Sequence, residues 1–191
     1  MAEGNRASGS TWHGSVAPCD HAVHIYKTDE AFVAALERYV ADGLTAGDGV
    51  VVVATAAHRE TLEQRLEARG VNLESARRRD QYIAVDAEHT LSQFMVDAWP
   101  DERLFESVVS TLVSRARGRK NRRVRAFGEM VVLLWNGGHH GATVRLEHLW
   151  RRICQLHSFA LLCAYPKDGF SEHTNASLLQ ICATHTHVIE G

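Results

Sequence analysis

The hydrophobic pattern of the chain alternates between short apolar runs and longer stretches with helical spacing. The short runs, which predict strands, lie at 21–26, 50–54, 82–85, 124–127, 159–164 and 188–189. The stretches with helical spacing lie at 28–43, 58–69, around 91–95, 104–113, 145–156 and 175–183. Strands that alternate with helices of this length are typical of βαβ units. We therefore expect an α/β fold of three layers, with a mainly parallel β-sheet flanked by helices.

Chain length and composition place these elements in one domain. Of the 191 residues, we expect 1–18 to form a disordered Gly/Ser-rich leader and 19–191 to form a single domain. The leader has no secretory signal pattern, and no apolar run is long enough to span a membrane. Lys and Arg number 21 against 23 Asp and Glu, which does not favour a dedicated nucleic-acid binder. We expect a cytoplasmic protein without a membrane partner, whose four widely spaced cysteines are reduced thiols.

Polar residues follow several of the predicted strands, at the edge where parallel sheets bind ligands. These carboxyl ends are expected at 54–58, 86–89, 129–130 and 165–168. The sequence allows two interpretations of Glu129. It is either a polar anchor of a ligand pocket, or a structural charge that pairs with an arginine or stands at a helix terminus. For Asp86 we favour helix capping before His89. Trp135 either lines an apolar pocket or packs against the sheet, and we favour packing.

Six segments, taken together and in order, resemble the MEDS family, the sensory domain named for methanogen and methylotroph regulators such as the dichloromethane-responsive repressor. They are HxxxxY at 21–26, GLTAGD at 43–48, RAFGEMV at 125–131, LExxW at 146–150, LCAYP at 162–166 and ICxxHxxV at 181–188. The resemblance covers about residues 19–190. It implies a degenerate RecA/KaiC-like P-loop NTPase architecture with a ligand-sensing role, usually beside a helix-turn-helix or a histidine kinase. We expect a stand-alone copy, in which Val23 stands where many members carry a cysteine.

A phosphate-binding loop is missing from the expected place after the strand at 50–54. Such a loop needs glycines for close backbone approach, together with a Lys and a Ser or Thr. Residues 54–60, Ala-Thr-Ala-Ala-His-Arg-Glu, contain neither Gly nor Lys. This argues against ATP hydrolysis, although a helix N-terminus near Thr55 and Arg59 could still attract an anion. Nothing else in the sequence marks a catalytic nucleophile or an acid–base pair, so we expect no catalytic residues.

Three histidine-containing clusters are candidates for metal binding. They are Cys19 with His21 and His24, His139 with His140, and Cys182 with His185 and His187. Strand alternation places His21 and His24 on opposite faces, and the glycines around 139–140 predict a solvated turn. Cys182 and His185 can share a helix face, and such ligands suit zinc. We nevertheless favour a buried cysteine and a helix-capping histidine there, because three ligands lack the paired spacing of zinc fingers.

Seven positive charges gather within residues 115–125. They indicate either contact with nucleic acid or an acidic partner, or a solvated loop between a helix and a strand. We favour the loop, because no aromatic residue is interleaved for base stacking. Nucleic acid is therefore not an expected partner.

The sequence as a whole favours a non-enzymatic sensory module that binds a small molecule at the carboxyl edge of the sheet and signals to a separate histidine kinase or transcription regulator. The candidate ligand-binding residues are His21, Tyr26, Thr55, His58, Glu129, Trp135 and Tyr165. One alternative is a ligand-free interaction module that regulates a kinase or transcription factor, and another is a nucleotide binder without hydrolysis. A homodimer is compatible with the sequence, and no particular cofactor is indicated.

Overall fold

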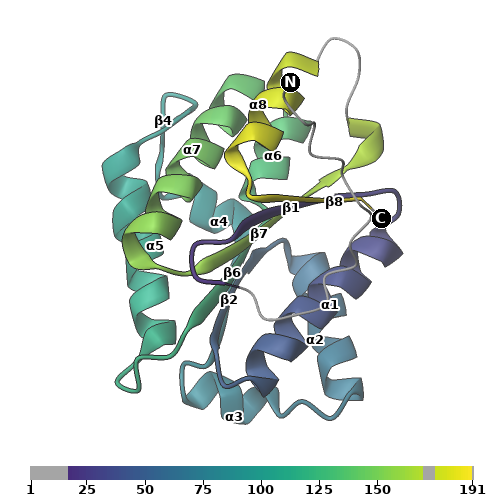
Figure 1. Ribbon diagram of the computed structural model, residues 1–191, viewed down its shortest axis with the longest axis vertical. Coiled ribbons are helices and arrows are strands. Elements are labelled where there is room, and N and C mark those ends of the chain that lie inside the picture. Colours follow the sequence, from purple (N-terminus) through teal and green to yellow (C-terminus); the bar gives the residue numbers. More distant parts are fainter. Residues whose placement is uncertain (1–16, 170–174, 191) are drawn as a thin grey trace, which may run out of the picture.

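Six parallel strands form the central sheet of the computed structural model, which describes residues 17–169 and 175–190 (Figure 1). The strands are β1 (His21–Tyr26), β2 (Gly49–Ala54), β3 (Tyr82–Asp86), β6 (Val124–Gly128), β7 (Ala160–Pro166) and β8 (His187–Glu190). Their order across the sheet is β3-β2-β6-β7-β1-β8. This confirms the predicted α/β class. Most of the predicted leader, 1–16, lies outside the described residues.

Helices cover both faces of the sheet, which makes three layers (Figure 1). One face carries α1 (Asp29–Thr45), α2 (Ala56–Ala68) and α3 (Leu73–Arg78). The other carries α4 (Ala87–Ser92), α5 (Glu102–Arg117), α6 (Met130–Asn136), α7 (His140–His157) and α8 (Asn175–Thr184). Among the described residues, no helix is long and apolar enough to cross a membrane.

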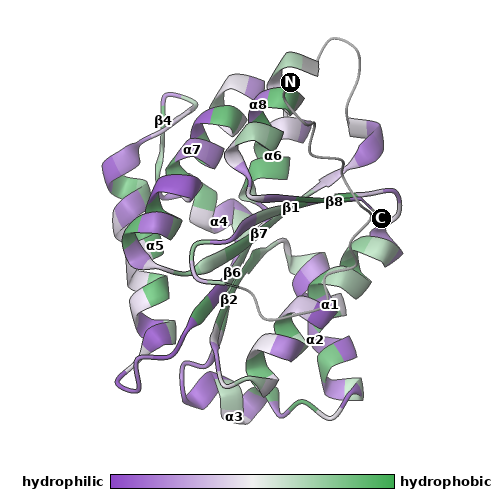
Figure 2. Ribbon diagram, viewed as in Figure 1, coloured by the Kyte–Doolittle hydropathy of each residue, from purple (hydrophilic) through white to green (hydrophobic). Residues whose placement is uncertain are grey.

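The inner strands β1, β2, β6 and β7 are buried on both faces, as their largely apolar sequences predict (Figure 2), whereas the edge strand β8 is mostly exposed. In β2, Val51 and Val53 face the core under α5, whereas Val50 and Val52 face the core under α1 and α2. All four are at most 2% exposed. Each buried valine contributes roughly 1.5–3 kcal/mol by the hydrophobic effect. Because successive side chains of a strand point to opposite faces of the sheet, the short strand β2 contributes to both cores.

The segment around 91–95 is the main error of the predicted pattern. The helix α4 ends at Ser92, before Phe94 and Met95. β4 (Met95–Val96) then pairs antiparallel with β5 (Trp99–Pro100). Asp97 and Ala98 turn the chain with φ of 49° and 60°, and the pattern lacked the glycine that usually marks such a turn. Phe94 is buried edge-on against Phe105. The apolar residue at this position therefore packs the start of a hairpin into the core and does not indicate a helix.

A buried ion pair joins β2 to β6 at the amino end of the sheet. Asp48, 3% exposed, precedes β2, and its Oδ2 accepts a hydrogen bond of 2.7 Å from Nε of Arg125 on β6. The guanidinium of Arg125, which is 6% exposed, also lies over the ring of Tyr39, 5.6 Å from its centroid. A buried guanidinium of this kind depends on its carboxylate.

We expect Asp48→Ala to lower the free energy of unfolding by about 3–5 kcal/mol, because it leaves the buried Arg125 without its counter-charge. Urea denaturation measures this loss. The matched control is Glu74→Ala, which removes the exposed pair between Glu74 and Arg78 and should change stability by less than about 1 kcal/mol. Equal effects in the two variants would contradict the assigned role of the buried pair.

Candidate functional site

The chain reverses its direction of travel across the sheet between β2 and β6. From β2 it crosses one face through α2 to β3, whereas from β6 it crosses the opposite face through α6 and α7 to β7. β2 and β6 are neighbours, so their connections diverge where the two strands end. Parallel sheets bind ligands at such a switch point, outside the carboxyl ends of the strands. The carboxyl ends of β2 and β6 are therefore the candidate position for a ligand site.

Three polar side chains meet at this switch point, and we call Thr55, His58 and Glu129 the Glu129 group. The Glu129 Oε2 accepts a hydrogen bond of 2.8 Å from the backbone N–H of Thr55, the N-cap residue of α2. Its Oε1 lies 2.7 Å from Nδ1 of His58. The Oγ1 of Thr55 lies 3.3 Å from both carboxylate oxygens. Among the described residues Glu129 is thus paired with a histidine and not with an arginine, and although it is the N-cap residue of α6, its side chain makes no capping hydrogen bond there.

The electrostatics of the Glu129 group favour the protonated form of His58. The hydrogen bond to Glu129 raises the pKa of His58, and partial burial opposes this shift only in part. The side chain of Glu129 is 6% exposed and that of His58 is 24% exposed. The histidine therefore forms the solvent-accessible end of a pair whose carboxylate is buried.

Aromatic side chains connect Tyr26 to the same edge. The ring of Tyr26, at the end of β1, stacks on Phe32 with centroids 4.9 Å apart. Phe32 in turn meets the ring of His58 edge-on at 4.9 Å. Burial raises the pKa of Tyr26 to about 12, with further contributions from the carboxylates of Asp29, Glu129 and Asp168. Tyr26 therefore stays a neutral phenol beside the Glu129 group.

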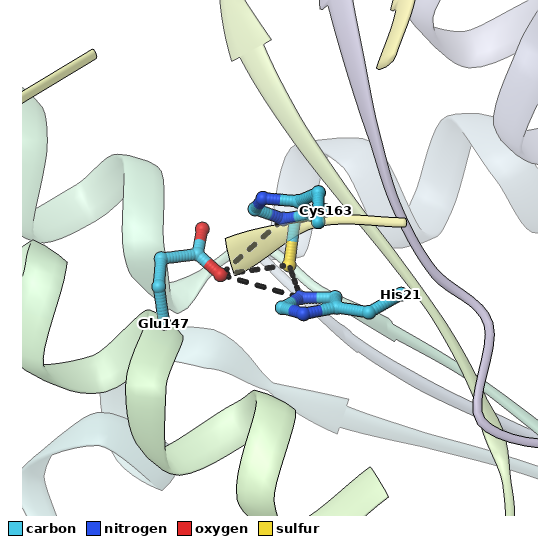
Figure 3. Close-up of side chains that lie close together, drawn as sticks. His21, Glu147 and Cys163 are labelled. Carbon is cyan, nitrogen blue, oxygen red and sulfur yellow. Dashed lines mark hydrogen bonds and ion pairs between the residues drawn. The ribbon is translucent and has the colours of Figure 1, made fainter. Parts of the chain in front are cut away.

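A second group of polar side chains is buried on the face of the sheet that α7 and α8 cover, opposite to the face that carries α1 and α2. It combines His21 of β1, Cys163 of β7, Glu147 of α7 and His185 of the segment between α8 and β8; we call these four residues the Glu147 cluster. The Glu147 Oε2 lies 3.3 Å from Nε2 of His21 and 3.4 Å from Nε2 of His185. The Sγ of Cys163 lies 3.5 Å from Nε2 of His21 and 3.7 Å from the Glu147 Oε2 (Figure 3).

Outer partners hold two members of the Glu147 cluster in place. The hydroxyl of Tyr165 donates a hydrogen bond of 2.5 Å to Oε1 of Glu147, so the other oxygen of that carboxylate faces the cluster. The Nδ1 of His185 lies 2.7 Å from the carbonyl oxygen of Ile181 and donates to it, which leaves Nε2 to face Glu147. The rings of His21 and His185 are 3.9 Å apart at their centroids.

Burial sets the protonation states in the Glu147 cluster. It lowers the pKa of His185 to about 4 against the opposing pull of the Glu147 carboxylate, and it raises the pKa of the Cys163 thiol well above its ordinary value. Burial alone raises the pKa of Glu147, but the neighbouring His185, His21 and Tyr165 bring it below its ordinary value. At neutral pH the cluster therefore contains a carboxylate, a neutral His185 and a protonated thiol. Such side chains could hold a metal ion.

The predicted ligand-binding residues fall into these two groups. Tyr26 and the Glu129 group gather at the carboxyl edge, as expected. His21 instead lies at the amino end of β1, in the Glu147 cluster. Tyr165 is held by that cluster, and Trp135 is packed beside it, 3% exposed, with its ring edge-on to Tyr165 at 6.0 Å.

Of the three predicted metal candidates near the carboxyl terminus, only His185 joins the Glu147 cluster. His187 is 59% exposed at its side chain and pairs with Asp20. Cys182 is partly buried and is not among the residues that converge. The sequence pattern missed Glu147 and Cys163 because they approach His21 only through the pairing of β1 with β7 and the packing of α7.

Two further expectations concern charged side chains. Asp86 caps α4 by accepting a hydrogen bond of 2.9 Å from the backbone N–H of His89, which confirms the favoured interpretation. The arginine-rich segment 115–125 is more than a solvated loop, since Arg125 is buried in β6. Arg115 pairs with Asp80, and Arg122 donates to the backbone carbonyls of Ala116 and Arg79.

We expect NMR titration to give a pKa for His58 above 6.5, and Glu129→Gln to bring it back toward that value. Because the folded-state pKa is raised, the pair should stabilise the fold fully below pH 6.5, and this contribution should vanish as the pH rises through the folded-state pKa. His187→Asn, which alters an exposed histidine, is the control. An unchanged His58 titration in Glu129→Gln would contradict the pairing.

One known protein family matches most of the chain. The sequence pattern of MEDS, the methanogen/methylotroph DcmR sensory domain, matches residues 20–186. Among the curated proteins compared with the chain, none matches. The matched range contains both polar groups, from His21 to His185. Because the match spans most of its length, the chain belongs to the MEDS family of sensory domains.

Proposed function

We propose that the chain is a non-enzymatic sensory module that binds a small molecule at the carboxyl edge of its sheet, beside the Glu129 group, and reports occupancy to a separate regulator. One observation carries this proposal: a buried carboxylate at the switch point between β2 and β6 pairs with a histidine that is partly open to solvent. Membership of a sensory family supports the same role.

The chemistry of the edge suits a small, mainly apolar molecule with one hydrogen-bonding group. His58 offers its second ring nitrogen, Nε2, because Nδ1 is engaged by Glu129. Phe32 and Tyr26 form the aromatic side of the same region. Pockets that combine apolar walls with a few polar groups are typical of small-molecule sites.

The position of the Glu129 group also suggests how occupancy is reported. Thr55 is the N-cap residue of α2, and Glu129 is the N-cap residue of α6. These helices lie on opposite faces of the sheet. A molecule that competes for His58 would weaken the contact that joins the two helix starts, and so favour a second arrangement of α6 against α2.

Nucleotide binding has less support. The β2–α2 turn lacks the glycines and the lysine of a phosphate loop. The Glu129 carboxylate lies against the N-cap residue of α2, which is where a phosphate would have to approach. A buried negative charge there repels a second anion. A ligand-free interaction role for the arginine-rich segment also has less support, since Arg115, Arg122 and Arg125 are held by groups of the chain itself.

Thermal unfolding in the presence of short-chain alcohols, carboxylates, amines and halogenated hydrocarbons, and of ATP with Mg²⁺, tests the proposal. We expect at least one of the small organic compounds to raise the Tm, since ligand at 100 times its Kd stabilises a protein by about 2.7 kcal/mol. The compound should bind Glu129→Gln with an apparent affinity at least tenfold weaker, and so give a smaller Tm shift. The control Glu74→Gln should keep the wild-type shift. ATP with Mg²⁺ should give no shift.

Two results would count against the proposal. A compound that shifts the Tm equally in Glu129→Gln and Glu74→Gln binds elsewhere, which removes the Glu129 group from the site. Steady turnover of any of these compounds or of ATP by the purified protein would overturn the non-enzymatic assignment.

A further inference from the structure

We propose that the Glu147 cluster is a binding site for one divalent transition-metal ion of the zinc type. The ligands would be Nε2 of His21, Nε2 of His185, Sγ of Cys163 and Oε2 of Glu147. This site lies on the opposite face of the sheet from α1 and α2, and it is independent of the ligand site proposed at the carboxyl edge.

Four of the six spacings between the ligand atoms are close to those of tetrahedral coordination. Zinc bonds of about 2.0–2.3 Å to nitrogen, oxygen and sulfur require ligand atoms about 3.3–3.6 Å apart at tetrahedral angles. The Glu147 Oε2 lies 3.3 Å and 3.4 Å from the two histidine nitrogens. The Sγ of Cys163 lies 3.5 Å from Nε2 of His21 and 3.7 Å from the same oxygen. All four ligand atoms lie within 4.8 Å of one another.

The ligand nitrogen of His185 is not satisfied by the described side chains around it. The Nε2 of His185 is buried and makes no hydrogen bond with any described residue, although it lies close to the Glu147 carboxylate. An unsatisfied buried nitrogen that faces a carboxylate and a thiol is costly unless another partner is present. A cation at the centre would accept its lone pair.

The outer atoms of two ligands are held as metal ligands usually are. Metal-bound histidines typically donate their other ring N–H to a carbonyl or carboxylate, and ligating carboxylates are themselves hydrogen-bonded. His185 donates to the carbonyl of Ile181, and Glu147 accepts from Tyr165. His21 has no such partner among the described residues at Nδ1. Its ring is placed by β1 and by contact with the ring of His185.

The charges of the cluster balance a divalent ion. The thiol of Cys163 would lose its proton to solvent as the sulfur–metal bond forms, with no change of oxidation state. One thiolate and one carboxylate then carry two negative charges against the two positive charges of the metal, and the two imidazoles are neutral. A neutral assembly is what a fully buried site requires. Four protein ligands leave no open position, so the site is structural in type.

Binding would join four segments that are distant in the sequence. His21 and Cys163 lie on adjacent strands, Glu147 on α7, and His185 between α8 and β8. A metal ion would therefore fix the carboxyl-terminal α8 and β8 to the sheet. By joining these distant segments, the bound ion would stabilise the folded chain.

Metal content and cobalt spectra of the purified full chain test the proposal. We expect about one equivalent of zinc by elemental analysis, either as purified or after zinc loading and removal of excess with a weak chelator. Cobalt loading of the metal-free protein should give visible ligand-field bands of tetrahedral intensity and a thiolate-to-cobalt charge-transfer band in the near ultraviolet.

Variants separate the proposed ligands from their neighbours. Cys163→Ala should abolish the charge-transfer band, whereas Cys154→Ala, which alters another buried cysteine, should retain it. Glu147→Gln and His185→Gln should each weaken zinc at least tenfold, and His187→Asn should not. The wild-type measurements decide the matter even if a cluster variant fails to fold.

Substoichiometric zinc after loading, together with an octahedral cobalt spectrum without a charge-transfer band, would overturn the proposal. A charge-transfer band that survives in Cys163→Ala and disappears in Cys182→Ser would also overturn it, because it would move the site to the neighbouring cysteine of α8.

Discussion

A carboxylate that is buried against a parallel sheet must find its partners inside the protein, and this constraint shapes both polar groups of the molecule. Glu129 and Glu147 are 4% and 0% exposed. Each carboxylate has partners from other elements of the fold: those of Glu129 come from the β2–α2 turn and the first turn of α2, and those of Glu147 come from β1, β7 and the segment before β8. An isolated buried carboxylate costs several kcal/mol. The contacts that remove this cost also fix how α2, α7 and the last strand meet the sheet.

The two carboxylates differ in the access of solvent to their partners, and this difference separates their roles. His58 is partly exposed, so under the proposed function the Glu129 group would exchange one partner for a molecule from solution. The side chains around Glu147 are almost completely buried, at most 2% exposed for His21 and His185. A closed group of that kind suits a metal ion that remains bound and does not exchange with solvent. Under the two proposals, the same sheet supports an exchangeable site at its carboxyl edge and a closed cluster beneath α7 and α8.

Much of the fold could be predicted from the sequence, because buried strands and amphipathic helices have distinct hydrophobic periods. The valine run of β2 predicted a strand buried on both faces, and the carboxyl ends of β2 and β6 brought Thr55, His58 and Glu129 together as expected. The hairpin at Met95–Pro100 could not be predicted, since Asp97 and Ala98 carry no glycine signal for their turn. Local patterns encode an element, whereas a contact between distant elements depends on register and packing.

The Glu147 cluster illustrates that limit. Residues 125–131 and 146–150 are family-like segments whose connection becomes visible only in space, where Trp150 lies about 3.1 Å from the place a side chain would occupy at Gly128. That close packing seats α7 on β6 and presents Glu147 to the strands beyond.

Val23, which stands where the family resemblance implies a cysteine in many members, lies beside the Glu147 cluster. Val23 lies two residues after His21 on the same face of β1, and its register partner on β7 is Cys163. A cysteine at position 23 would therefore have stood beside the Glu147 cluster. In this chain the neighbouring strand supplies a thiol at that place, within 3.5 Å of His21. Val23 instead adds apolar packing to the core, so the cluster contains one sulfur and two imidazoles around a single carboxylate.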